Sequence, residues 1–473
     1  MLPDTKTFID TIRSNVSFFN TNEEVIITRA PGRLDVMGGV ADYSGSLVLQ
    51  LPIADATHVA LQKSDLTSLH VLSLGIEARS IEFDLSEFLN VDNEPIGYDQ
   101  ARQRFATPTY HWAAYIAGVF LVLMREKGAH FIRGARILIS SNVPEGKGVS
   151  SSAALEVAVM QAVAAAFEIE LAPTEGARLC QKVENLVAGA PCGIMDQMTA
   201  ACGEQNQLLE LLCQPDLLKG TLALPNELKL WGIDSGVRHS VSGSDYGTVR
   251  TAAFMGYRII ADDLPKRSAN VSGRVEIDDS RWHGYLANIT PDEFETSYRN
   301  VLPERMTGEE FLDRYQGITD NVTSVEPSIE YPILQATKHP IYENARVQSF
   351  ASILKNWGGF EQGKELGSLM FESHQSYSNC GLGSEATDLI ADLVRGALDD
   401  GLFGARITGG GSGGTVAVLG RSDAEQAITK LTQDFQERTG YKPLVITGSS
   451  PGAVIFGHLK LDLSRNEVST TTR

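Results

Sequence analysis

Residues 143–159 (VPEGKGVSSSAALEVAV) place two glycines and three consecutive serines ahead of a helical pattern. Glycines in such a loop let backbone N–H groups approach a ligand closely, and the serines open a helix whose positive end faces the same point. This arrangement suits a phosphate group, and a serine hydroxyl can also bind magnesium. The spacing is not that of a Walker A motif, and a glycine turn before an overcapped helix is the alternative. The candidate phosphate contacts are Gly146, Lys147, Gly148, Ser150, Ser151 and Ser152.

Two further stretches could contribute to the same site. At 407–419 (ITGGGSGGTVAVL), five glycines around Ser412 precede a strand pattern, which predicts a flexible loop able to cover a ligand. A glycine-rich hairpin is the alternative there. At 29–53, charged and aromatic side chains crowd a loop between two strand patterns, where a salt-bridged turn is the alternative. These side chains are Arg33, Asp35, Asp42 and Tyr43.

The elements that must position these residues alternate along the chain. Hydrophobic patterns predict strands over 24–30, 46–52, 58–61 and 136–140, and a helix over 112–127, so that the phosphate loop lies between a strand and a helix. A second alternating half has predicted strands at 228–234, 414–419 and 454–456. Between about 260 and 339 the sequence is acidic and carries prolines, and only a short helix over 308–315 is clear, which indicates an elaboration of the second half.

Length and composition set the class of protein. A chain of 473 residues exceeds a single core, so we expect two domains, 1–225 and 226–473, with a cleft between them. The formal charge of −19 disfavours nucleic-acid binding, and an anionic ligand would need local donors. The chain has no apolar run of membrane-spanning length, its start lacks the pattern of a secretory signal, and its five cysteines lack paired C-x-x-C spacing. These features favour a cytoplasmic protein without a membrane partner, and they leave the oligomeric state open.

The three stretches, in this order, resemble the GHMP kinase superfamily, and within it the galactokinase branch. The matching motifs are PGRLDVMGGVADYSGS at 31–46, PEGKGVSSSAALEVA at 144–158 and TGGGSGGTVAVL at 408–419. Further matches are VENLVAGAPCGIMDQM at 183–198 and DSGVRHSVSGSDY at 234–246. The resemblance implies an α+β fold in which a ribosomal-S5-like N-terminal domain meets a ferredoxin-like C-terminal domain, with the active site in the cleft. It also implies ATP, Mg²⁺ and a small-molecule sugar as ligands.

The resemblance also implies roles for individual residues. Asp196 matches the catalytic aspartate and Arg33 the arginine beside it, while Ser152 and Glu184 match the magnesium ligands. A neighbouring guanidinium keeps a carboxylate ionised and weakly basic, so Asp196 either accepts the proton of the anomeric hydroxyl or only positions that hydroxyl. The implied ATP or phosphate contacts are the loop residues above with Ala153, Gly410 and Gly411. The implied sugar contacts are Asp42, Asp35, Gly39, Tyr43, Tyr246 and Arg238.

The departures from galactokinase bear on the substrate. Where galactokinases have Gly-Glu-His-Thr-Asp-Tyr, this chain has GGVADY at 38–43. In the family, the aspartate binds ring hydroxyls, whereas the glutamate and histidine surround the exocyclic C6 hydroxymethyl. The resemblance implies a sugar 1-kinase, and the absence of these two residues at Gly39 and Val40 indicates a pentose, L-arabinose, as its substrate, with D-galactose and D-galacturonate as alternatives. A sugar and ATP sensor without activity is the alternative from another class, but the residues matching the catalytic machinery are all present.

Overall fold

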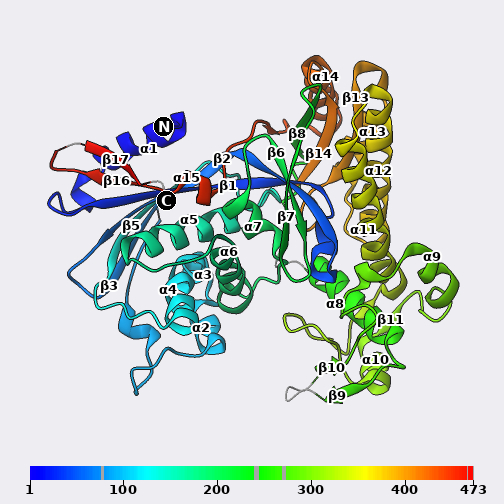
Figure 1. The fold of residues 1–473 in the computed structure, drawn as a ribbon, viewed down its shortest axis with the longest axis horizontal. Helices are drawn as coiled ribbons and strands as arrows, with labels where there is room; N and C mark the ends of the chain where they lie inside the picture. The colour runs from blue at the N-terminus through cyan, green and yellow to red at the C-terminus, as the bar shows by residue number, and fades with distance from the viewer. Residues whose placement is uncertain (76–78, 239–243, 269–272, 466, 472–473) are drawn as a thin grey trace.

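The structure, a computed structural model, describes residues 1–75, 79–238, 244–268, 273–465 and 467–471. Its larger sheet is built from long strands near the N-terminus, extended by strands from the far end of the chain (Figure 1). The strands of this sheet are β1 (Val25–Met37), β2 (Leu47–Lys63), β3 (Ser68–Leu74), β4 (Arg79–Asp84), β5 (Ala135–Ser141), β6 (Gln207–Leu212), β7 (Leu217–Ala223), β16 (His458–Asp462) and β17 (Glu467–Thr471). The main order is β17-β16-β1-β2-β5-β3-β4, with β6 paired to β2 and β7 to β6; only β3 and β5 are parallel.

Helices cover both faces of this sheet unequally. One face carries α2 (Tyr98–Phe105), α3 (Pro108–His111), α4 (Ala114–Lys127), α5 (Ser151–Ala166), α6 (Pro173–Lys182) and α7 (Met195–Cys202), and α1 (Pro3–Ser14) packs on the other (Figure 1). Ten residues of α4 are buried, because this helix is apolar on nearly all sides and lies inside the layer. The buried face of α5 fixes the direction of its N-terminus, which the phosphate loop leads into.

A second, four-stranded sheet has the order β13-β14-β8-β15. Its strands are β8 (Leu228–Asp234), β13 (Leu402–Ile407), β14 (Thr415–Arg421) and β15 (Val445–Ile446). The long helices of the second half of the chain are α8 (Ser244–Ile260), α11 (Ile333–Lys355), α12 (Phe360–Asn379), α13 (Glu385–Arg395) and α14 (Glu425–Thr439). Along β8, Trp231 and Ile233 face the core with α13 and α14, while Leu228 and Leu230 face the core with α11 and α12. This alternation is the period of two that a strand covered on both faces requires.

The acidic stretch forms a separate lobe around α8 and the start of α11 (Figure 1). Its elements are β9 (Lys266–Ser268), β10 (Val275–Ile277), α9 (Pro291–Glu293), β11 (Met306–Thr307), α10 (Gly308–Tyr315) and β12 (Glu330–Tyr331). Trp282, Phe294 and Phe311 are buried in one cluster with the apolar face of α8. The lobe is therefore anchored to the helix that carries Tyr246.

Short helices complete the chain. Five are 3₁₀ helices, η1 (Val16–Phe18), η2 (Gly39–Ser44), η3 (Leu85–Phe88), η5 (Leu286–Asn288) and η7 (Leu398–Asp400), and two are π helices, η4 (Val183–Ala188) and η6 (Phe294–Tyr298). α15 (Ala453–Phe456) is a single α-helical turn. Across the described residues, none of the helices has both the length and the apolar character needed to cross a bilayer.

The predicted elements agree with the structure in most places and differ in three. The strand over 228–234 and the helix over 308–315 are confirmed as β8 and α10. The strands predicted at 46–52 and 58–61 are one continuous strand, β2. The strand predicted at 454–456 is helical, since a run of three apolar residues does not distinguish the two states. The span 226–473 is also not a single unit, because β16 pairs with β1 in the first sheet.

Candidate active site

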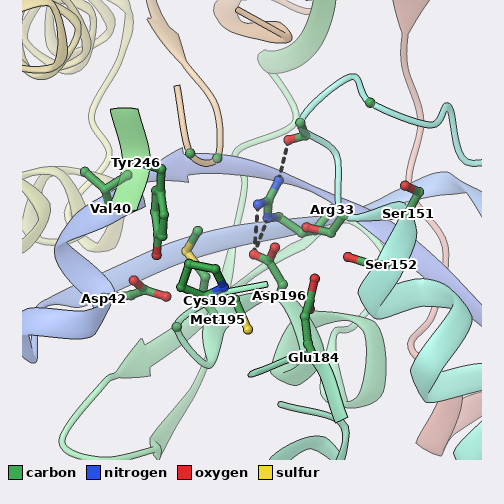
Figure 2. Close-up of a pocket in the computed structure, with 17 residues that line it drawn as sticks. Arg33, Val40, Asp42, Ser151, Ser152, Glu184, Cys192, Met195, Asp196 and Tyr246 are labelled. Atoms are coloured by element: carbon green, nitrogen blue, oxygen red, sulfur yellow. Dashed lines mark hydrogen bonds and ion pairs between the residues drawn. The ribbon is translucent and has the colours of Figure 1, made fainter. Parts of the chain in front are cut away.

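A cleft with an empty volume of about 660 Å³ lies where the two sheets and their loops meet (Figure 2). It is bounded by β1, η2, the N-terminus of α5, η4, the start of α7, α8 and the loop between β13 and β14. The residues predicted from the sequence that line it are Arg33, Asp42, Gly146, Gly148, Ser150, Ser151, Ser152, Glu184, Asp196, Tyr246 and Gly410. Arg33 and Gly410, which are more than 370 positions apart in the sequence, therefore line one cavity.

The phosphate loop presents its polar groups to this cleft. Ser150 has a φ of 61°, and its side chain does not cap α5. Its buried Oγ has no hydrogen-bond partner among the described residues, although it lines the cleft. Ser151 and Ser152 begin α5, so their backbone N–H groups belong to the positive end of a 16-residue helix. The loop thus fits an oxyanion that is not part of the protein.

Lys147 has a different orientation from its neighbours. Its Nζ lies 2.8 Å from a carboxylate oxygen of Asp234 at the end of β8. Its carbonyl oxygen accepts a 2.8 Å hydrogen bond from Thr415 Oγ1 on β14. These two contacts join the phosphate loop to the second sheet. Lys147 does not line the cleft, in contrast to its predicted role as a phosphate contact.

Arg33 and Asp196 form the centre of the cleft (Figure 2). Both Nε and Nη2 of Arg33 lie 2.8 Å from Asp196 Oδ1. Arg33 Nη1 donates to the Gly148 carbonyl at 2.7 Å, which ties the guanidinium to the phosphate loop. Arg33 is buried, while the side chain of Asp196 remains 21% exposed. The aspartate is therefore fixed in orientation by a buried cation and still faces the cavity.

Three further carboxyl groups, those of Asp42, Glu156 and Glu184, lie near this pair. Burial, and then repulsion by Asp196, raise the pKa of Asp42 to about 7. Burial raises the pKa of Glu184 to about 7 as well, with Asp196 adding to the rise. Burial and the neighbouring Glu184 raise the pKa of Glu156 well above its ordinary value. Such a site is stabilised by hydrogen-bond donors or by a cation.

A divalent cation fits the side of the cleft where Glu184 and Ser152 lie together (Figure 2). The hydroxyl of Ser152 lies beside Glu184 and opposes the rise in the pKa of that carboxyl. Glu184 Oε2 accepts a 2.6 Å hydrogen bond from Gln197 Nε2. The described residues contain no cluster of three or more His, Cys, Asp or Glu side chains arranged for a metal. A cation held here would thus have few protein ligands, as is usual for Mg²⁺ bound together with phosphates.

The opposite side of the cleft presents Val40, Asp42 and Tyr246 (Figure 2). Gly193 packs against Asp42 so closely that a Cβ at this position would lie 1.6 Å from Asp42 Oδ2. Any side chain at Gly193 would displace the carboxylate. The glycine before Asp196 therefore allows the loop 189–194 and the Asp42 carboxylate to share one wall.

Asp35 and Gly39 were predicted to contact the sugar, but neither residue lines the cleft. The Asp35 carboxylate accepts hydrogen bonds from Arg406 Nη1 at 2.8 Å and from Gln50 Nε2 at 2.7 Å, and it is fully buried outside the cleft lining. Gly39 has a φ of 47°, and a Cβ there would lie 1.6 Å from the hydroxyl oxygen of Tyr377. Both residues fix the shape of the segment that carries Val40 and Asp42.

Four further predicted residues also lie outside the cleft lining. Tyr43 is next to the cleft, with its ring beneath the Arg250 guanidinium. Arg238 is exposed and lies beside Gly146, at the edge of 239–243, which fall outside the described residues. Ala153 is buried within α5, and Gly411 packs on Leu382.

Sequence reasoning missed several residues of the cleft wall. They are Pro191, Cys192, Gly193, Met195 and Gly409. All five lie within the motifs at 183–198 and 408–419, so motif membership was the available signal. Their side-chain chemistry is unremarkable in isolation, because they contribute shape and backbone to the site.

Three family descriptions match separate parts of the chain. "GHMP kinases N terminal domain" matches residues 114–204, and "GHMP kinases C terminal" matches residues 354–437. "Galactokinase galactose-binding signature" matches residues 16–63, which contain β1 and η2. The matched segments include the phosphate loop, Glu184, Asp196 and the Asp42 segment.

Similar proteins agree with these matches. An L-arabinokinase of Arabidopsis thaliana is 45% identical over 94% of this chain, and the chain spans about half of that protein, 47%. A galactokinase of Chloroflexus aggregans is 30% identical, over 91% of this chain and 93% of its own length. The crystal structure of Lactococcus lactis galactokinase complexed with galactose has a TM-score of 0.72 at 22% identity, covering 95% of this chain and 98% of that one.

Proposed function

The chain belongs to the GHMP kinase family, within its galactokinase branch, and from this membership and the site geometry we propose that it is an ATP-dependent sugar 1-kinase acting on L-arabinose. The product is L-arabinose 1-phosphate. The Arabidopsis relative's name supports this substrate, and the galactokinase relatives support the reaction class.

The arrangement of the cleft supports phosphoryl transfer. Ser151 and Ser152 lie at one end, Asp42 and Tyr246 lie at the other, and Asp196 lies between them (Figure 2). A sugar held at the second end would present its anomeric hydroxyl near Asp196, facing a phosphate on the loop. Because phosphoryl transfer has a loose transition state, it depends mainly on such alignment and on charge stabilisation.

The roles of the central pair follow from their contacts. Arg33 holds Asp196 through two 2.8 Å contacts to the same oxygen and reaches the phosphate loop through the Gly148 carbonyl. Asp196 Oδ2 is left to accept a hydrogen bond from the acceptor hydroxyl. In this arrangement Asp196 would orient the hydroxyl and receive its proton as the bond from the sugar oxygen to the γ-phosphorus of ATP forms and the bond from that phosphorus to the oxygen of the leaving ADP breaks.

We assign the binding of Mg²⁺ to Ser152 and Glu184. When bound, Mg²⁺ would neutralise the charge of the ATP phosphates. The raised pKa of Glu184 supports this assignment, since a carboxylate held at about 7 without a cation releases its proton readily when one binds. Gln197 keeps one Glu184 oxygen occupied, so that the carboxylate stays in a single orientation.

The pentose assignment rests on the part of the cleft wall around residues 39 and 40. Tyr377 Oη occupies the space of a side chain at Gly39, accepts a 2.8 Å hydrogen bond from the Val40 N–H and donates to the Gly409 carbonyl at 2.9 Å. Val40 thus faces the cleft with an apolar side chain, where an exocyclic hydroxymethyl would need polar partners. β-L-Arabinopyranose is the galactopyranose ring without that group.

A uronic acid has less support. Among the described residues that line the cleft, Arg33 is the single cation, and Asp196 already pairs with it. A carboxylate at C6 would face Val40 without a positive partner and close to other carboxylates. D-Galactose would lack a partner for its C6 hydroxyl but keeps every ring hydroxyl.

A coupled ADP-release assay with L-arabinose, D-galactose and D-galacturonate tests the proposal. We expect L-arabinose to have the highest kcat/KM, with a margin over D-galactose of roughly 10- to 200-fold, because a missing hydroxymethyl discriminates weakly. Preference for D-galactose would overturn the pentose assignment and leave the kinase assignment intact. No sugar-dependent ADP release with any sugar would favour a sensor.

The cytoplasm remains our proposed compartment. All five cysteines are free thiols, and three of them are buried. This agrees with a reducing environment, in which no disulfide contributes to the fold.

A further inference from the structure

Arg250 joins the cleft wall to the acidic lobe. It lies four residues after Tyr246 on α8, so the two side chains share one face of the helix. Its Nε and Nη2 donate to the two oxygens of Asp320 at 2.8 Å each. Its third donor, Nη1, reaches the carbonyl oxygen of Cys192 at 3.1 Å. Arg250 and Asp320 are both buried.

The lobe holds Asp320 in place by local hydrogen bonds. Thr323 donates to Asp320 Oδ2 from Oγ1 at 2.7 Å and from its backbone N–H at 3.1 Å. The Val322 N–H lies 3.3 Å from Oδ1. These bonds within the lobe hold the Asp320 carboxylate in one orientation. Because Arg250 binds both oxygens of that carboxylate, the orientation of its guanidinium is fixed as well.

The contact of Arg250 with the Cys192 carbonyl connects it to the loop that precedes Asp196. Cys192 lines the cleft and precedes Gly193, which packs on Asp42, and Asp196 follows three positions later. The Arg250 guanidinium also lies 5.4 Å from the ring centroid of Tyr43, the residue after Asp42. One buried cation thus contacts both segments that form the sugar end of the cleft.

The location of the Arg250–Asp320 pair indicates a role other than stabilising the fold. A buried ion pair contributes little net stability compared with apolar residues of the same volume, because both charges lose their hydration. Here the pair links the 260–339 lobe to the loop 189–194 and to η2, which lie on other parts of the fold. The charge of Arg250 also opposes the rise in the pKa of Asp42.

We propose that Arg250 is a positioning residue for the sugar end of the cleft, and that the acidic lobe serves, through Asp320, to fix it there. The inference rests on the proposed sugar kinase activity. It assigns to the lobe a part in sugar recognition: the lobe orients the Cys192 carbonyl and the Tyr43 ring, and through them Asp42 and the loop before Asp196.

The test compares Asp320→Asn, Thr323→Val and the double variant Arg250→Gln with Asp320→Asn. The double variant removes both charges of the Arg250–Asp320 pair together, and Thr323→Val removes one bond to Asp320 while keeping both charges. Arg305→Gln is the matched control, because it breaks the exposed Arg305–Glu330 pair of the same lobe, whose atoms lie 2.6 Å apart. KM for L-arabinose, KM for ATP, kcat and the melting temperature are measured for each protein.

We expect the KM for L-arabinose to rise ~10- to 100-fold in Asp320→Asn and in the double variant, by analogy with the loss of a hydrogen-bonding partner behind a metal ligand. The rise should be smaller in Thr323→Val and absent in Arg305→Gln, with the KM for ATP within about twofold throughout. An unchanged sugar KM in the folded double variant, or equal rises in both KM values, would overturn the inference. If the parent phosphorylates no sugar, the proposed function fails and the inference fails with it.

Discussion

Replacing Glu184 with glutamine should make the ligand-free protein more stable at high pH. Burial, and then repulsion by Asp196, raise the pKa of Glu184 from 4.5 to about 7. In the unfolded chain the group ionises near its ordinary value, so the folded state binds the proton more tightly. The resulting contribution to stability is fully present below about pH 4.5 and is lost as the pH rises through about 7.

The size of the effect follows from the same values. One pKa unit corresponds to ~1.4 kcal/mol, so ionising Glu184 in the folded protein lowers the unfolding free energy by about 3 kcal/mol at pH 8. Glutamine is neutral at every pH and can still accept the hydrogen bond from Gln197. The gain of Glu184→Gln over the parent should therefore be under ~1 kcal/mol at pH 5 and about 3 kcal/mol at pH 8.

Urea unfolding of both proteins between pH 5 and 8, without nucleotide or Mg²⁺, measures this difference. Glu361→Gln is the control, because the Glu361 side chain is 87% exposed and its replacement should give no pH-dependent gain. Adding Mg²⁺ with ADP should stabilise the parent at pH 8 more than Glu184→Gln, and turnover of the variant should require more Mg²⁺. A variant that is less stable than the parent at pH 8, or a gain that does not change with pH, would refute the reasoning.

The remaining predictions concern the acceptor side. Asp196→Asn should lower kcat by at least ~100-fold, the lower range for a lost proton acceptor, while calorimetry finds ATP affinity within about threefold of the parent; near-normal turnover would remove Asp196 from the reaction. Asp42→Ala should lower kcat/KM for L-arabinose and D-galactose by similar factors, since both share the ring hydroxyls; a selective loss in the ADP-release assay would contradict this. Gly39→Ala should lower the unfolding free energy by ~1–3 kcal/mol, because it combines a φ of 47° with a clash. Adding Tyr377→Phe should recover part of that loss in the same urea assay, and a purely additive loss would argue against the clash.

Much of the candidate site could be predicted because each of its parts belongs to a motif that is local in sequence. The phosphate loop lies between a strand and a helix whose patterns are strong, and the structure brings Ser150 and Ser152 to the cleft. The resemblance to the family implied the pairing of Arg33 with Asp196, and in the structure their atoms lie 2.8 Å apart. Short apolar runs were ambiguous, so 454–456 was assigned to the wrong class of element.

The parts that could not be predicted depend on contacts between distant segments. A glutamate at Gly39 looks like a simple route to a partner for a C6 hydroxyl, but Tyr377, 338 positions later, already fills that space. The tyrosine hydroxyl also binds the Val40 N–H and the Gly409 carbonyl, so it couples the sugar wall to the glycine loop. The identity of residue 39 is therefore constrained by α12 rather than by the sugar alone. A route to hexose recognition through position 39 would have to change Tyr377 first, because a side chain at this position has neither the room nor the backbone conformation that it needs.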